Sequence, residues 1–183
     1  MSEKFKHPSL EKIENPTVEP LTLADLKIYL RIDGSSEDSI LTSMLSASRE
    51  MAEQYMRNSI IKQKHRLTYY GLIPTLVLLP KGPVSEIVSV KLFDSEGSSA
   101  TLSSQQYYLS SKMQLNLNKS HSAHRIEVDY YAGFSEDTTD VPEIIKQGLL
   151  SQIAHMYEHR GTGRAGVDES AKSLFNFFKN YYL

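Results

Sequence analysis

The sequence predicts an α+β fold, in which a core of about four helices carries an inserted antiparallel β subdomain. Two observations lead to this prediction. Apolar residues recur at helical spacing near both ends of the 183-residue chain, whereas the middle alternates apolar and polar residues with a period of two. Consecutive strands of this kind need only short loops, which favours a small antiparallel sheet or barrel.

The N-terminal helical part is predicted over residues 21–58. Thr22 is a plausible N-cap with Asp25 three positions later, and the first helix should end near the turn dipeptide Asp33-Gly34. A long amphipathic helix follows from about residue 37 to 57. Its apolar positions at helical spacing are Ile40, Leu41, Met44, Leu45, Met51, Ala52, Tyr55 and Met56.

Two further segments lie on either side of this N-terminal helical part. Residues 1–20 are polar and rich in proline, so we expect a flexible N-terminal arm that becomes ordered only against another surface. Residues 59–134 form the predicted β-rich insert. Its alternating apolar positions are Val88, Val90 and Leu92, then Met113, Leu115 and Leu117, then Ile126, Val128 and Tyr130.

The C-terminal helical part is predicted over residues 140–183. Pro142 suits the first turn of a helix that runs to about Arg160. A glycine-containing loop follows, and Asp168 can cap a last helix that continues to the end of the chain. The aromatic and aliphatic residues of that last helix are Leu174, Phe175, Phe177, Phe178, Tyr181 and Tyr182.

Composition restricts the class of protein. The formal net charge is −2 and cysteine is absent, so disulfides and thiolate metal sites are excluded. No apolar run approaches the roughly 20 residues that a membrane-spanning helix needs, and the N-terminus lacks the apolar stretch of a secretion signal. We therefore expect a soluble protein that is not exported.

Two strings look like catalytic motifs but fail on context. Residues 161–166 spell G-x-G-x-x-G, yet they follow a helix instead of a strand, so a helix–helix linker explains them better than a dinucleotide site. His155, Glu158 and His159 spell the H-x-x-E-H arrangement of some zinc hydrolases. Only Asp168 or Glu169 could supply a third ligand, and a structural or interfacial histidine pair is the better interpretation.

A short basic cluster consists of Lys62, Lys64, His65 and Arg66. Neighbouring strand residues point to opposite faces, which halves the local density of positive charge. Together with Arg164, this cluster supports an alternative hypothesis, a DNA-packaging accessory protein that binds duplex DNA, for which steep salt dependence is expected.

Aromatic residues indicate an assembly surface. The C-terminal aromatic segment leaves little room for a solvated face, so it must dock on its own core or on a neighbour. Paired tyrosines place an aromatic ring on both faces of a strand, and the outer ring suits a protein interface, although a monomer with a tyrosine-rich surface remains an alternative. The pairs are Tyr69-Tyr70, Tyr107-Tyr108 and Tyr130-Tyr131.

The ends of the chain resemble a known family. Residues 19–33 read EPLTLADLKIYLRID and are followed by Glu37-Asp38 and the long helix. Residues 130–134 read YYAGF, residues 141–147 read VPEIIKQ, and residues 154–160 read AHMYEHR. In this order and separation, the segments resemble the head–tail connector (adaptor, or head-completion) proteins of tailed bacteriophages. One departure is Gly148, where an alanine is common in the family.

The resemblance implies a helical connector core and a structural protein with no enzymatic activity, no cofactor and no metal. It implies a ring-forming virion or prophage protein of about twelve-fold symmetry, assembled in the bacterial cytoplasm, that extends the DNA channel. The implied partners are other copies of the chain, the portal protein and a tail-joining or head-closure protein, with duplex DNA passing through without specific binding and no membrane. We expect the interface residues to be Tyr55, Tyr157, Arg160, Leu174, Phe175, Phe177, Phe178, Tyr181 and Tyr182.

Overall fold

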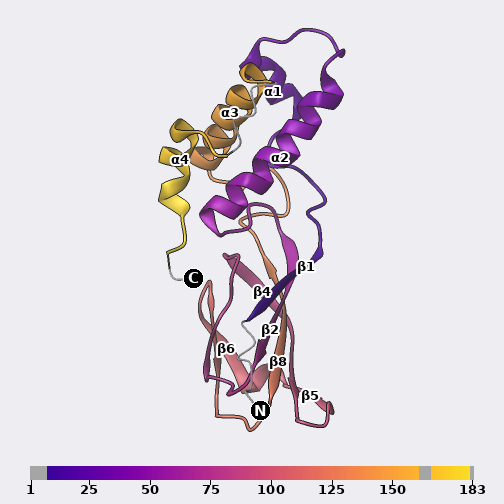
Figure 1. Cartoon of the computed structure of the whole chain (residues 1–183), viewed down its shortest axis with the longest axis vertical. Coiled ribbons are helices and arrows are strands. Elements are labelled where there is room, and N and C mark those ends of the chain that lie inside the picture. The colour runs from indigo at the N-terminus through magenta and orange to yellow at the C-terminus, as the bar shows by residue number, and fades with distance from the viewer. Residues whose placement is uncertain (1–7, 161–165, 182–183) are drawn as a thin grey trace, which may run out of the picture. The chain divides into compact units, whose positions relative to one another are not determined.

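The computed structural model describes residues 8–160 and 166–181. The described residues divide into two compact units, a β unit of residues 8–15 and 62–133 and a helical unit of residues 16–61, 134–160 and 166–181. Each unit has its own hydrophobic core. The predicted α+β class, with helices encoded on both sides of an antiparallel β region, is confirmed (Figure 1).

The helical unit contains four α-helices, α1 (Leu23–Leu30), α2 (Asp38–Met56), α3 (Glu143–Glu158) and α4 (Glu169–Phe175). The predicted capping box starts α1, because the Thr22 side chain accepts a hydrogen bond from the Asp25 backbone N–H and the Asp25 side chain accepts one from the Thr22 N–H. The apolar stripe of α2 and the inner faces of α3 and α4 fill the core. Its fully buried members include Leu26, Leu41, Met56, Ile145, Leu149, Ile153 and Phe175.

The last helix is shorter than the sequence predicted. It ends at Phe175, and a turn of 3-10 helix over Asn176–Phe178 leads into extended chain. Tertiary hydrogen bonds replace helical ones here, since the Asn58 side chain donates to the carbonyl of Phe178 (2.6 Å) and the Asn180 N–H donates to the carbonyl of Met56 (2.8 Å). The prediction of a helix to the chain end was therefore wrong in its extent.

The β unit is built from two antiparallel sheets. The larger has the order β1-β2-β8-β4-β5, and the smaller has the order β3-β7-β6. The larger sheet contains β1 (Ser9–Glu14), β2 (Gln63–Tyr70), β4 (Val84–Phe93), β5 (Ser99–Thr101) and β8 (Arg125–Ala132). The smaller contains β3 (Leu76–Leu78), β6 (Tyr107–Ser111) and β7 (Gln114–Leu117).

Side chains from both sheets share the core of the β unit. Ile126, Val128 and Tyr130 of the central strand β8 are fully buried, as is Leu115 of β7. These residues alternate with more exposed ones, as the period of two predicted. Of the tyrosine pairs, Tyr130 faces this core, whereas Tyr108 on the edge strand β6 is 57% exposed.

Residues 9–14, which the sequence placed in a flexible arm, form strand β1. This strand pairs with β2 in a register that runs from Ser9 opposite Thr68 to Glu14 opposite Lys64. Most of its side chains are exposed, so it shows no alternation of polarity. Its partner lies far along the sequence, and the pairing is therefore invisible to local patterns.

No helix among residues 8–160 and 166–181 combines the length and the hydropathy that crossing a bilayer requires.

Candidate assembly surface

Helix α4 packs against α3 at Gly148. Phe175 is fully buried, and a Cβ added to Gly148 would lie only 2.4 Å from the Cε1 atom of the Phe175 ring. The absence of a side chain at Gly148 therefore makes room for this aromatic ring. The residue that departs from the family pattern is thus explained by the packing of the C-terminal aromatic segment.

The segment after α4 docks on its own helical unit. The Tyr55 hydroxyl of α2 donates to the side-chain oxygen of Asn176 (2.7 Å), and Lys179 Nζ lies 4.1 Å from the centroid of the Tyr55 ring. Phe178 packs edge-on against Phe134, with ring centroids 5.6 Å apart. These contacts hold the segment at the end of α2.

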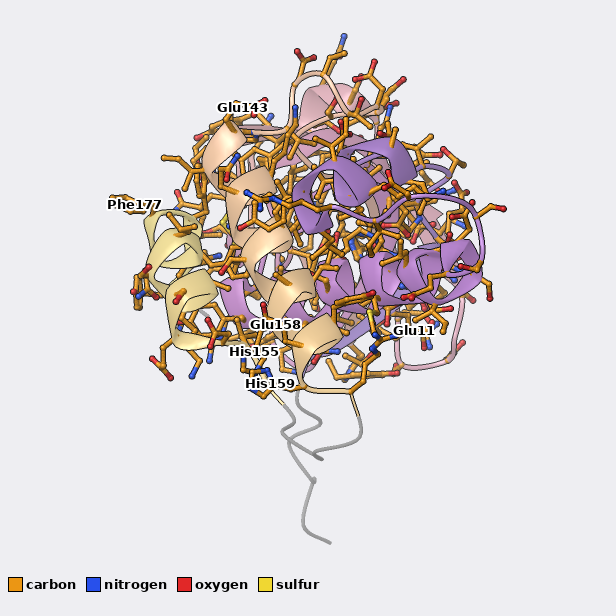
Figure 2. All side chains as sticks on the ribbon, turned by 90° about the horizontal axis from the view of Figure 1, so that it is seen from above. Glu11, Glu143, His155, Glu158, His159 and Phe177 are labelled. Atoms are coloured by element: carbon orange, nitrogen blue, oxygen red, sulfur yellow. The ribbon has the colours of Figure 1, made fainter. Side chains whose placement is uncertain are left out.

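Two aromatic side chains of this segment are not buried in the core. Phe177 is 75% exposed and Tyr181 is 70% exposed, while Leu174 is partly buried. Figure 2 shows Phe177 projecting outward from the ribbon of the α4 segment. Tyr182, which the sequence also placed in the interface, lies outside the described residues. The rings of Phe177 and Tyr181 are thus exposed to solvent on a segment whose backbone is held by hydrogen bonds to the helical unit.

Tyr157 and Arg160 lie together at the C-terminal end of α3. The Arg160 guanidinium lies 4.0 Å from the centroid of the Tyr157 ring, and its Nη1 is 3.3 Å from a carboxylate oxygen of Glu37, the N-cap of α2. A hydrogen bond with Glu37 raises the pKa of the Tyr157 phenol. These contacts connect the end of α3 to the start of α2.

The histidines of the H-x-x-E-H string form a stacked pair. Their rings lie 4.3 Å apart, His159 Nδ1 is 2.9 Å from the carbonyl oxygen of His155, and His155 Nδ1 is 3.4 Å from the Asp168 carboxylate (Figure 2). Asp168 also accepts the Ser170 N–H as the N-cap of α4. These contacts join α3 to α4, and no group of three potential metal ligands occurs in the described part of the chain. Of the glycine string, only Gly166 is described, and residues 161–165 lie outside.

The basic cluster on β2 is largely neutralised. Arg66 makes a bidentate pair with Asp129 (2.7 and 2.8 Å), and Lys64 lies 3.3 Å from Glu14. Lys62 Nζ lies 4.8 Å from the centroid of the Tyr131 ring. His65 points to the opposite, buried face, and burial together with nearby lysines lowers its pKa to about 4, so it is neutral near pH 7.

The structure also contains features that the sequence reasoning missed. Ile28 on α1 is 78% exposed. The sequence could have predicted this exposure, because Ile28 lies off the helical face defined by Leu23, Leu26 and Leu30. Arg49 of α2 is buried and pairs with Glu19 (2.7 Å) and Glu53 (3.3 Å). This buried ion cluster had no signal in the sequence, since charges in an amphipathic helix usually face water.

Comparisons with known proteins agree with this architecture. Three similar chains in solved structures share 20–21% sequence identity with this chain and cover 95–96% of it and 96–97% of their own length. They come from the neck of an empty gene transfer agent (GTA) particle computed with C6 symmetry (TM-score 0.80), the virion of a native GTA particle (0.76) and the neck of a native GTA particle computed with C12 symmetry (0.76). At this identity the likeness concerns the fold. No curated protein matches the chain.

A family model identifies the chain more directly. The model of the phage gp6-like head-tail connector protein matches residues 20–125, more than half of the 183-residue chain. This match confirms the resemblance seen in the sequence, and with it the interpretation as a structural protein instead of an enzyme. The chain belongs to the phage gp6-like head-tail connector family.

Proposed function

We propose that copies of this chain form a ring of the twelve-fold class that joins the portal of a phage or phage-like head to the tail and extends the DNA channel. The observation that carries the proposal is the match over 96% of the chain to a protein in a neck computed with C12 symmetry. The ring would belong to the virion and would assemble in the bacterial cytoplasm, with the portal on one side and a tail-joining protein on the other.

The assembly role is assigned to the helical parts, residues 21–58 and 140–183, with the β-rich insert of residues 59–134 as an elaboration. A cyclic ring needs two different, complementary patches on each copy. The exposed Phe177 and Tyr181 supply one candidate patch, to which the partly buried Leu174 and Phe178 of the same segment are assigned, and Tyr55 supports the segment from α2. Tyr157 and Arg160, at the end of α3, supply a second candidate. Phe175 contributes indirectly, by seating α4.

Charge supports transient passage of DNA without tight binding. Acidic side chains outnumber basic ones in residues 16–61 and again in residues 134–160 of the helical unit. Tight duplex binding requires concentrated positive charge, because neutralised phosphates supply most of the affinity. A gel-shift assay at low salt should therefore show no retained duplex, and strong retention that falls steeply with salt would favour the packaging-accessory alternative.

The ring itself is tested by mixing the purified chain with its cognate portal and examining the product by negative-stain microscopy and mass photometry. We expect an added ring on the portal. Combined Phe177→Ser and Tyr181→Ser changes should reduce joining while leaving the chain folded, because both side chains are mostly exposed. Tyr108→Ser on the β unit is the matched control. Failure of the unaltered chain to join the portal at high concentration would contradict the proposal.

A further inference from the structure

Within the described residues, three segments of the chain connect the β unit with the helical unit, and one ion cluster on α2 is linked to all of them. The connections are residues 15–22 between β1 and α1, residues 57–62 between α2 and β2, and residues 133–142 between β8 and α3. The ion cluster consists of Glu19, Arg49 and Glu53. We propose that it fixes the three connections on the helical unit, and that its loss frees them while the helical core stays folded.

Arg49 holds the first connection. Its guanidinium donates two hydrogen bonds to the carboxylate of Glu19, from Nε (2.7 Å) and from Nη2 (3.2 Å). Two bonds from a planar guanidinium fix the orientation of a carboxylate as well as its distance. Because the Arg49 side chain is buried, water competes little for these bonds. The segment that leads from β1 to α1 is therefore attached to α2 at Glu19.

Glu53 holds the second connection. It is buried and lies one helical turn after Arg49, whose Nη1 is 3.3 Å from one of its carboxylate oxygens. The other oxygen accepts the N–H of Ile60 (2.8 Å). The left-handed backbone of Arg57 (φ 59°) ends α2, and the following residues fold back far enough for Ile60 to reach Glu53. The ion cluster thus binds the backbone that leads from α2 to β2.

The backbone of Ile60 extends this linkage to the third connection. Its N–H donates to Glu53, and its carbonyl accepts the N–H of Phe134 (2.9 Å), the residue at which the chain re-enters the helical unit after β8. Ile61 and Ser135 continue the contact as a parallel β-bridge. A continuous series of hydrogen bonds therefore links the ion cluster to all three connections.

The ion cluster contributes direction more than stability. Moving charged groups out of water costs roughly what their mutual attraction returns, so apolar side chains of similar volume often stabilise a core equally well. Apolar packing is non-directional, however, and could bind neither the Glu19 carboxylate nor the Ile60 N–H. We therefore expect apolar replacement of Arg49 and Glu53 to preserve the folded helical unit and to release the connections.

The first test releases one connection at the partly exposed Glu19. In Glu19→Ala, the heteronuclear NOE of the Thr17 and Val18 amides should fall toward the values of a flexible chain. Glu50→Ala is the matched control, because the exposed Glu50 carboxylate lies 4.0 Å from the same guanidinium but belongs to α2 itself. An unchanged NOE in Glu19→Ala, or an equal fall in Glu50→Ala, would overturn the proposal.

The second test removes the ion cluster from α2. Arg49→Met with Glu53→Leu replaces both buried charges and removes the acceptor of the Ile60 N–H. In native-state hydrogen exchange, the Ile60 and Phe134 amides should exchange at least about tenfold faster relative to the amides of α3, the factor expected for loss of one hydrogen bond to a charged group. Arg49→Met with Glu53→Gln keeps an acceptor oxygen for Ile60 and should preserve slow exchange at both amides.

A core variant distinguishes this role from general destabilisation. Leu149→Ala shortens a fully buried side chain of the same core that forms no hydrogen bonds, and it should accelerate exchange in α3 and at Ile60 and Phe134 alike. If Arg49→Met with Glu53→Leu gives that uniform pattern, or if circular dichroism shows this variant to be unfolded, the ion cluster serves core stability and the proposal is wrong. These measurements use the chain alone, so their outcome is independent of the proposed ring.

Discussion

Gly148 shows how one residue determines the position of a helix. Glycine weakens a helix by about 1 kcal/mol relative to alanine. Here, however, a Cβ would lie 2.4 Å from a ring carbon of Phe175. We expect Gly148→Ala to destabilise the protein by about 1–3 kcal/mol despite its better helix propensity, because overpacking forces α3 and α4 apart. Urea unfolding measures the change.

A double-mutant cycle identifies the cause of that loss. In a Phe175→Leu background, which removes Cε1, the ring atom nearest to Gly148, and Cζ, the same alanine substitution should cost less or become favourable. If alanine costs the same in both backgrounds, the contact with Phe175 is not the reason for the glycine.

His65 makes the stability of the β unit depend on pH. Burial lowers its pKa from 6.5 to about 4, so the unfolded chain binds the proton more tightly than the folded one. The stabilisation is fully present above pH 6.5 and is lost as the pH falls toward 4. We expect a loss of about 2 kcal/mol between pH 7 and pH 5 in urea unfolding followed by signals of the β unit.

The control for this prediction is His65→Phe, which keeps an aromatic ring of similar size next to Tyr130, with which His65 now packs at a centroid distance of 5.7 Å. The variant should show a flatter pH profile in the same range. An unchanged slope would mean that another group is responsible.

At the scale of elements, the start of α1 depends on a capping box. Thr22 and Asp25 satisfy each other's backbone N–H groups, at 3.1 Å and 2.9 Å. Thr22→Ala should destabilise the helical unit by about 1 kcal/mol, whereas Thr22→Ser, which keeps the hydroxyl, should have little effect. Thermal unfolding followed by circular dichroism distinguishes the two, and equal melting temperatures for both variants would contradict the assignment.

At the scale of the whole molecule, residues 62–133 of the β unit form an insert whose removal can be tested. The Phe134 N–H donates to the carbonyl of Ile60 (2.9 Å), and Ile61 and Ser135 form a β-bridge, so the chain leaves and re-enters the helical unit at neighbouring points. Replacing residues 62–133 with a Gly/Ser linker of about six residues should leave a helical unit that unfolds cooperatively.

This shortened chain tests where the assembly surface lies. It should still join the portal, because the candidate patches lie on the helical unit. Circular dichroism measures folding, and the portal-joining assay measures assembly. A folded shortened chain that cannot join the portal would place the assembly surface on the β unit instead.

The sequence by itself determined the helices, the alternating strands and the family. Thr22 with Asp25, the stripe of α2 and the period of two around Val128 are local patterns, and local backbone preferences together with solvent exposure are sufficient to produce them. The tertiary structure decided the rest. The pairing of β1 with β2, the early end of α4, the neutralised charges of Lys64 and Arg66 and the open edge of β3 all depend on residues distant in sequence, and no local pattern specifies which of them meet.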